Sequence, residues 1–77
     1  MQKDIKIYTS PNCSYCDRAK ELFAERGLKF SEIDITKNIS EAGKIFQKYG
    51  KLSVPVIFIG EEVFFGYQRK RILDALK

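Results

Sequence analysis

The feature that most constrains this chain is a pair of cysteines, Cys13 and Cys16, placed where a strand pattern gives way to a helix pattern. Residues 5–9 alternate apolar and polar side chains, and residues 15–26 repeat apolar side chains at helical spacing. The ordinary pKa of a cysteine thiol is about 8.5. At the start of a helix, free backbone N–H groups favour the thiolate form. The second cysteine follows one turn later on the same side of the helix. This spacing predicts a dithiol in which one sulfur attacks a disulfide and the other resolves the adduct.

Two other uses of a cysteine pair are less compatible with this sequence. A closed zinc site needs about four Cys or His ligands, and the chain has two cysteines and no histidine. A structural staple that closes so short a loop would stabilise the fold by only about 2 kcal/mol, and such disulfides are rare in the cytosol. Redox chemistry is therefore the interpretation we favour, with no metal site in one chain.

Length and composition predict a single small domain over residues 1–77 with enough apolar residues, 44%, for a core. The net charge of +4 is dispersed and does not interleave with aromatic residues, so we expect no nucleic-acid binding. The longest apolar run, residues 54–59, contains a proline and is far shorter than the roughly 20 residues of a membrane span. With no apolar signal segment at the start, we expect a monomeric cytoplasmic protein without membrane attachment.

The remaining periodicity predicts the element order βαβαββα, with the first two strands parallel. The predicted strands are residues 5–9, 30–35, 54–59 and 62–65, and the predicted helices are residues 15–26, 38–50 and a last one from residue 69. The apolar face of the second helix is predicted to comprise Ala42, Ile45, Phe46 and Tyr49. A two-residue hairpin at Gly60-Glu61 would join the last two strands.

Helix ends are predicted from capping residues. Asn12 is the expected N-cap of the first helix, and Gly27 is expected to end it in a left-handed conformation. The stretch from Asn38 to Glu41 resembles a capping box for the second helix, which Gly50 would close.

Taken together, the order of elements and four landmarks resemble the glutaredoxin branch of the thioredoxin fold. The landmarks are Tyr8-Thr9 before the cysteines, the segment from Cys13 to Lys20, Ser53-Val54-Pro55 and a late glycine, Gly66. The resemblance implies an α/β fold, a four-stranded mixed sheet of order 2-1-3-4 flanked by three helices. It also implies a cis peptide bond between Val54 and Pro55, and cis bonds are essentially confined to X–Pro.

The resemblance implies a thiol–disulfide oxidoreductase that reduces protein disulfides or glutathione mixed disulfides. Cys13 would be the nucleophile and Cys16 the buried resolving thiol. Tyr15 would form one wall of the substrate groove, although a plain surface aromatic would look the same. Pro55 would face the dithiol while the backbone of Val54 pairs with an extended substrate; alternatively, the proline merely starts a strand. No tightly bound cofactor is expected, and glutathione would act only as a reducing co-substrate.

Two departures from the family pattern concern glutathione. Glutathione-dependent members usually have a basic residue where Ser10 stands, and an Asp where Gln68 stands. The turn Phe65-Gly66-Tyr67-Gln68-Arg69 looks more like that of glutaredoxin-like redoxins, which serve ribonucleotide reductase and are reduced by thioredoxin reductase. Gly66, Tyr67 and Gln68 remain candidate substrate-binding residues at the last helix N-terminus. Either glutathione or thioredoxin reductase is thus an expected electron donor, with disulfide-containing proteins as partners.

Ser14 stands where many members have proline, and it opens a second hypothesis. Some members with serine here hold a [2Fe–2S] cluster between two chains with glutathione, so a glutathione-assisted iron–sulfur carrier is the alternative function. A third hypothesis is a binding module that keeps the fold without chemistry.

Overall fold

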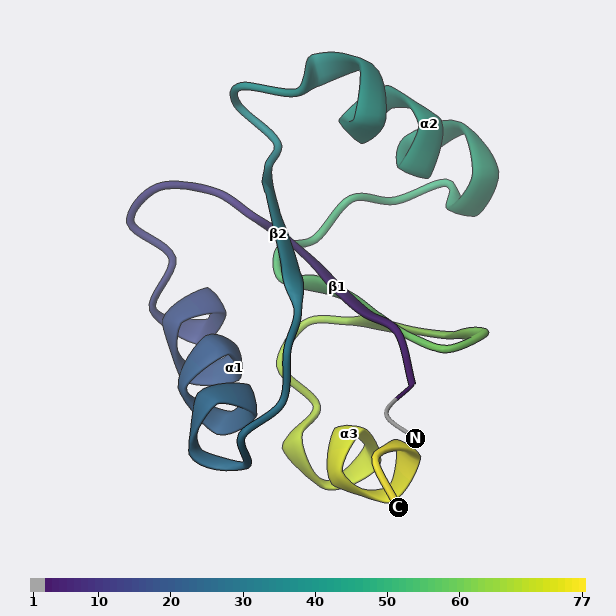
Figure 1. The fold of residues 1–77 in the computed structure, drawn as a ribbon. Helices are drawn as coiled ribbons and strands as arrows, with labels where there is room; N and C mark the ends of the chain where they lie inside the picture. The colour runs from purple at the N-terminus through teal and green to yellow at the C-terminus, as the bar shows by residue number, and fades with distance from the viewer. Residues whose placement is uncertain (1–2) are drawn as a thin grey trace.

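The computed structural model describes residues 3–77 and contains the seven elements in the predicted order (Figure 1). The strands are β1 (Ile5–Thr9), β2 (Ser31–Asp34), β3 (Val56–Ile59) and β4 (Glu62–Phe65). The helices are α1 (Ser14–Glu25), α2 (Ile39–Tyr49) and α3 (Arg69–Ala75). Observed and predicted ends differ by at most two residues, within the usual uncertainty of helix and strand ends.

The four strands form one mixed sheet in the order β2-β1-β3-β4, which confirms the predicted topology. β1 is parallel to β2 and antiparallel to β3, and β4 returns along β3 from the tight turn at Gly60. In this register Tyr8 lies between Ile33 of β2 and Val56 of β3. The carboxyl end of β1, from which the cysteine segment leaves, therefore lies beside the start of β3.

One face of the sheet is covered by α1 and α3. Their apolar side chains pack on alternate strand residues, which point to one face because successive side chains in a strand alternate. The cluster comprises Ile5, Ile7, Ala19, Leu22, Phe23, Ile57, Ile59, Phe64, Ile72 and Ala75. Phe23 is completely buried, and its ring contacts that of Phe30 at 5.6 Å between centroids. This cluster fixes α1, and with it the cysteines, against the sheet.

The other face is packed against α2 through a smaller cluster centred on Tyr8, Ile45 and Val56. Because α2 follows the end of β2 and leads to the start of β3, it covers only the end of the sheet near the cysteines (Figure 1). The prediction that Phe46 joins this face is wrong, since 58% of its surface is exposed. The stripe that contacts the sheet runs through Ile45 and Tyr49, and Phe46 is turned about 100° away from Ile45 around the helix.

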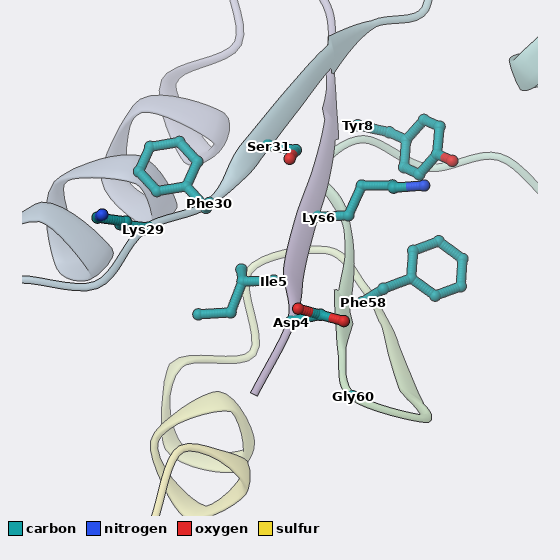
Figure 2. A pocket seen from close by; sticks show the side chains of 9 residues that line it. All are labelled: Asp4, Ile5, Lys6, Tyr8, Lys29, Phe30, Ser31, Phe58 and Gly60. Carbon is teal, nitrogen blue, oxygen red and sulfur yellow. The ribbon is translucent and has the colours of Figure 1, made fainter. Parts of the chain in front are cut away.

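A groove of about 740 Å³ lies at the end of the sheet that α2 leaves uncovered. Figure 2 shows Lys6, Tyr8 and Phe58 together on one side of β1, where Lys6 pairs with Phe58 and the rings of Tyr8 and Phe58 are 5.7 Å apart. The groove is lined by Asp4, Ile5, Lys6, Tyr8, Lys29, Phe30, Ser31, Phe58 and Gly60. These residues surround the start of β1, so the groove lies at the end of the sheet away from the cysteines.

Glycines end α1 and α2 as predicted. Gly27 has a left-handed φ of 67°, and the N–H groups of Gly27 and Leu28 donate to the carbonyls of Ala24 and Phe23, each at 3.0 Å. This is the paired hydrogen bonding of a Schellman motif. Gly50, with φ of 74°, donates its N–H to the carbonyl of Phe46 at 2.8 Å.

Two predicted N-terminal caps are wrong in detail. Asn12 adopts a left-handed φ of 60°, whereas an N-cap residue needs extended backbone, and Cys13 takes the cap position instead with φ of −107°. Asn is one of the few residues that tolerate the left-handed region. Asn38 does cap α2, but without a capping box: its side-chain amide donates to the carbonyl of Asp34 at 2.9 Å. Glu41 instead accepts a 3.5 Å hydrogen bond from the Tyr8 hydroxyl.

A polar contact ties α1 to the two parallel strands, β1 and the edge strand β2. One carboxylate oxygen of Glu32 accepts hydrogen bonds from the Thr9 hydroxyl at 2.9 Å and from Lys20 Nζ at 3.0 Å. The hydrogen bond from Lys20 is the main cause that lowers the pKa of Glu32, and the same bond raises the pKa of Lys20. Thr9 immediately precedes the cysteine segment, so this contact helps hold the base of that segment.

Replacing Phe23 by alanine should lower the free energy of unfolding by about 3–5 kcal/mol, because it leaves a cavity in the core beneath α1. Phe46→Ala removes the same side chain from an exposed position and should change stability by no more than about 0.5 kcal/mol. Urea unfolding followed by circular dichroism would measure both. Equal losses would contradict the packing described here.

The Glu32 carboxylate should contribute stability that depends on pH. Its pKa is lower in the folded chain than its ordinary value of 4.5, so the contribution is complete above that value and disappears as pH falls through the folded pKa. Both partners are partly exposed, so we expect about 0.2–1 kcal/mol. Glu32→Gln should therefore be less stable than the parent at pH 7, and the gap should close as pH falls below the lowered pKa of Glu32. Glu61→Gln, at the hairpin turn, is the control and should show no such gap.

Candidate functional site

The two cysteines lie at the first turn of α1 and are joined by a disulfide. Cys13 is the N-cap residue, and its Sγ accepts a hydrogen bond from the backbone N–H of Cys16 at 3.1 Å. The carbonyl of Cys13 accepts from the N–H of Asp17 at 3.2 Å, which begins the helical hydrogen-bond pattern. The α-carbons of the cysteines are 5.2 Å apart, within the ordinary range for disulfides.

Exposure distinguishes the two sulfur-bearing residues. Cys13 is partly accessible, whereas only 1% of the Cys16 surface is exposed. The N–H that contacts Cys13 Sγ in the disulfide is also placed to donate to a thiolate at that atom, and the helix N-terminus favours negative charge there. The accessible residue can thus meet a disulfide from outside, while the other can act only on an adduct formed beside it.

The Val54–Pro55 peptide bond is cis, as the resemblance implied. Pairing of Tyr8 with Val56 places Pro55 beside Thr9, at the base of the cysteine segment. Pro55 is buried and Val54 is partly exposed. Within residues 3–77, the backbone N–H and C=O of Val54 make no hydrogen bond to the protein. This main chain is therefore available to an extended ligand, which is what the predicted role of Val54 requires.

The turn between β4 and α3 is fastened to the same proline. The N–H of Gly66 donates to the carbonyl of Pro55 at 2.8 Å. Gln68 is engaged within the protein at both ends of its amide: Nε2 donates to the carbonyl of Phe65 at 2.9 Å, and Oε1 accepts from Arg71 at 3.1 Å. Gln68 thus supports this turn, and its predicted contact with substrate would require at least one of these hydrogen bonds to be exchanged.

Two tyrosines connect this turn to the cysteines. The rings of Tyr15 and Tyr67 are 6.5 Å apart, within the range of attractive aromatic pairs. Tyr15 is 56% exposed and lies between the two cysteines in sequence, so its ring can form a wall next to the disulfide. The exposure alone would also suit a surface aromatic, but the contact with Tyr67 makes Tyr15 part of an edge shared by α1 and the turn.

All the predicted site residues therefore lie on one edge of the molecule, at the carboxyl end of β1. Sequence reasoning missed Arg18, whose guanidinium carbon lies 5.4 Å from the centre of the Tyr15 ring. It also missed Lys51, whose Nζ lies 4.6 Å from the centre of the Phe65 ring. The sequence does offer a signal for the Arg18–Tyr15 contact, because Arg18 follows Tyr15 by three residues and such pairs are neighbours on a helix. No local pattern relates Lys51 to Phe65.

Metal ligands are scarce around this site. Among residues 3–77, no group of three or more His, Cys, Asp or Glu side chains could hold a metal ion. The alternative function of an iron–sulfur carrier needs ligands from two chains and from added thiols, and it stays a prediction. In the same described region, no helix is long and apolar enough to cross a membrane.

Comparison with known proteins agrees with this geometry. The family model described as Glutaredoxin matches residues 5–64. Glutaredoxin 3 of Escherichia coli strain K12 is 35% identical over 94% of this chain and 87% of its own length, and a glutaredoxin of Pseudomonas aeruginosa is 39% identical over 94% and 93%. Among solved structures, the glutaredoxin-like protein NrdH-redoxin from Escherichia coli superposes with a TM-score of 0.79 at 27% identity, covering 92% of each chain.

These matches extend over the strands, the cysteine pair and the cis-proline segment, and the fold is the one that the resemblance implied. The family model alone covers well over half of the sequence. On this evidence the chain belongs to the glutaredoxin family.

Proposed function

We propose that this protein is a thiol–disulfide oxidoreductase that reduces disulfides of other proteins with Cys13 and Cys16. The observation that carries the proposal is the partly exposed Cys13, whose sulfur accepts a hydrogen bond from the N–H of Cys16 at the start of α1 and is bonded to the buried Cys16. The family's cysteine pair supports the coarse activity. Its protein targets and its electron donor are part of the proposal.

The reaction transfers two electrons in two exchanges. The Cys13 thiolate attacks one sulfur of the substrate disulfide, forms a mixed disulfide and releases the other substrate sulfur as a thiolate that takes up a proton. Cys16 then loses its proton and attacks Cys13 Sγ, which forms the Cys13–Cys16 disulfide seen here and releases the second substrate thiol. A donor that delivers two electrons and two protons restores the dithiol.

Substrate would lie along the edge formed by Val54, Pro55 and the two tyrosines. The unbonded backbone of Val54 supports a short β-like pairing with an extended peptide next to the attacked sulfur. The hydrogen bond from Gly66 to Pro55 keeps the turn bearing Tyr67 against this segment. These residues would position the disulfide, and Cys13 would do the chemistry.

Glutathione and a thioredoxin reductase are the two candidate donors. Ser10 and Gln68 lack the charges with which a tripeptide carboxylate and ammonium would pair, and the amide of Gln68 is already bonded within the protein. The similarity to NrdH-redoxin, whose reported activity profile is thioredoxin-like, supports the reductase. We infer a cytoplasmic location, where such donors keep dithiols reduced.

Cys13→Ser should abolish reduction of insulin disulfides, because the attacking sulfur is lost. Cys16→Ser should stop dithiol turnover while leaving a stable mixed disulfide between Cys13 and the substrate, which mass spectrometry would detect. In the reduced parent, alkylation by iodoacetamide should show Cys13 as a thiolate at a pH where a free cysteine is mostly protonated. Full insulin turnover by the Cys13 variant would refute the proposal.

The donor can be identified by NADPH-coupled turnover with glutathione and its reductase, or with thioredoxin reductase alone. We expect the second system to support faster turnover of the parent protein. Gln68→Asp should add an exposed partner for an ammonium group, about 1 kcal/mol, and lower the KM for glutathione about five-fold. Gln47→Asp, on the exposed side of α2, is the control and should leave that KM unchanged. Faster turnover of the parent with glutathione and its reductase would instead identify glutathione as the donor.

A further inference from the structure

Two positively charged side chains lie over aromatic rings of residues in or beside the candidate site. Arg18 lies over Tyr15, and Lys51 lies over Phe65, the residue just before the Gly66 turn. A ring attracts a cation without neutralising it, since the attraction comes from its quadrupole. Both side chains therefore keep their full charge near the edge where substrate would lie.

Within residues 3–77, the carboxylates that form ion pairs do so with cations other than Arg18 and Lys51. Lys20 pairs with Asp17 and Glu32, and the remaining pairs are Lys44–Glu41 and Lys77–Asp74. In particular, the acid nearest the cysteines in sequence, Asp17, is 3.7 Å from Lys20 Nζ. Over this same described stretch, no carboxylate oxygen lies within 4.0 Å of Arg18, Lys51 or Arg69.

A small cleft of about 300 Å³ lies between α1 and the start of α3, next to Tyr67. Arg18 lines it from α1 and Arg69 from α3, with Leu22 also contributing to its wall. Glu21 and Glu25 line it from the exposed side of α1, and neither pairs with the two arginines. Tyr67, which lines this cleft, contacts Tyr15, the residue that precedes Cys16.

We propose that Arg18, Lys51 and Arg69 select protein substrates in which the attacked cysteine lies in an acidic segment. This inference rests on the proposed function and adds the substrate class. Arg18 lies on α1, Lys51 in the loop between α2 and β3, and Arg69 on α3, so together they face a stretch of polypeptide rather than one group. Complementary charge acts mainly by speeding encounter and by rejecting wrongly charged partners.

The test uses the full chain and two peptides of equal length, each with one cysteine joined by a disulfide to a fluorescent thiol. Two Glu residues flank the cysteine in one peptide, and two Lys residues in the other; bis(2-hydroxyethyl) disulfide serves as the uncharged substrate. At about 0.01 M salt, where charges interact over about 30 Å, the parent should prefer the acidic peptide about ten-fold in kcat/KM. At about 1 M salt the preference should disappear, since the screening length is then about 3 Å.

The triple variant Arg18→Gln/Lys51→Gln/Arg69→Gln should lose most of this preference, mainly through a higher KM for the acidic peptide. Each single variant should lose part of it, which keeps the test valid if the triple variant folds poorly. Lys6→Gln removes the same charge from the far end of the sheet and should keep the parent's preference.

The outcomes separate this inference from the proposed function. A parent that reduces the uncharged disulfide but does not prefer the acidic peptide at low salt would overturn the inference alone. The inference is also overturned if the triple variant loses activity on the acidic, basic and uncharged substrates equally. A parent that reduces none of the three substrates would overturn the proposed function itself.

Discussion

The hydrogen bond from the Cys16 amide to the sulfur of Cys13 is the contact on which the site depends. It exists because the N-cap of α1 is Cys13 and not Asn12. The left-handed turn at Asn12 brings the chain around after Pro11, so that Cys13 can be extended and still lie at the helix end. The sulfur then takes the place that a Ser or Asp oxygen has in an ordinary N-cap. The same geometry thus caps the first helical turn and provides the N–H group that would stabilise a thiolate at Cys13.

The rest of the fold keeps that helix end in position. The apolar side of α1 packs on the sheet through Ala19, Leu22 and Phe23, and Lys20 reaches Glu32 on β2 from the flank. From the other side, pairing of β1 with β3 sets Pro55 beside Thr9, and Gly66 binds the carbonyl of Pro55. The edge of the molecule that holds the cysteines is therefore assembled from segments that are distant in the sequence, each placed by the sheet.

Much of this arrangement follows from the sequence because apolar periodicity and turn residues act locally. The strand alternation at Ile5 and Ile7, the apolar spacing along α1 and the glycine at position 27 each determine their own few residues. The N-cap at Cys13 could not be predicted that way, because Asn12 is an equally good cap on its own. The exposure of Phe46 was missed for a different reason. The pattern of a helix shows which side chains are apolar, while the narrow contact of α2 with the sheet decides which are covered. Lys51 and Phe65, fourteen positions apart, meet only through the fold.

The unbonded main chain of Val54 has a consequence for how selective such a protein can be among its partners. In the proposed function, a partner that pairs with it would be recognised by atoms that every polypeptide possesses, so this part of the contact would accept nearly any extended stretch with an accessible disulfide. Selection among partner proteins must then come from side chains around this segment, which can be substituted one at a time without disturbing Cys13. With the proposed function, such a protein could change its substrate proteins through surface substitutions while Cys13 and Cys16 stay unchanged.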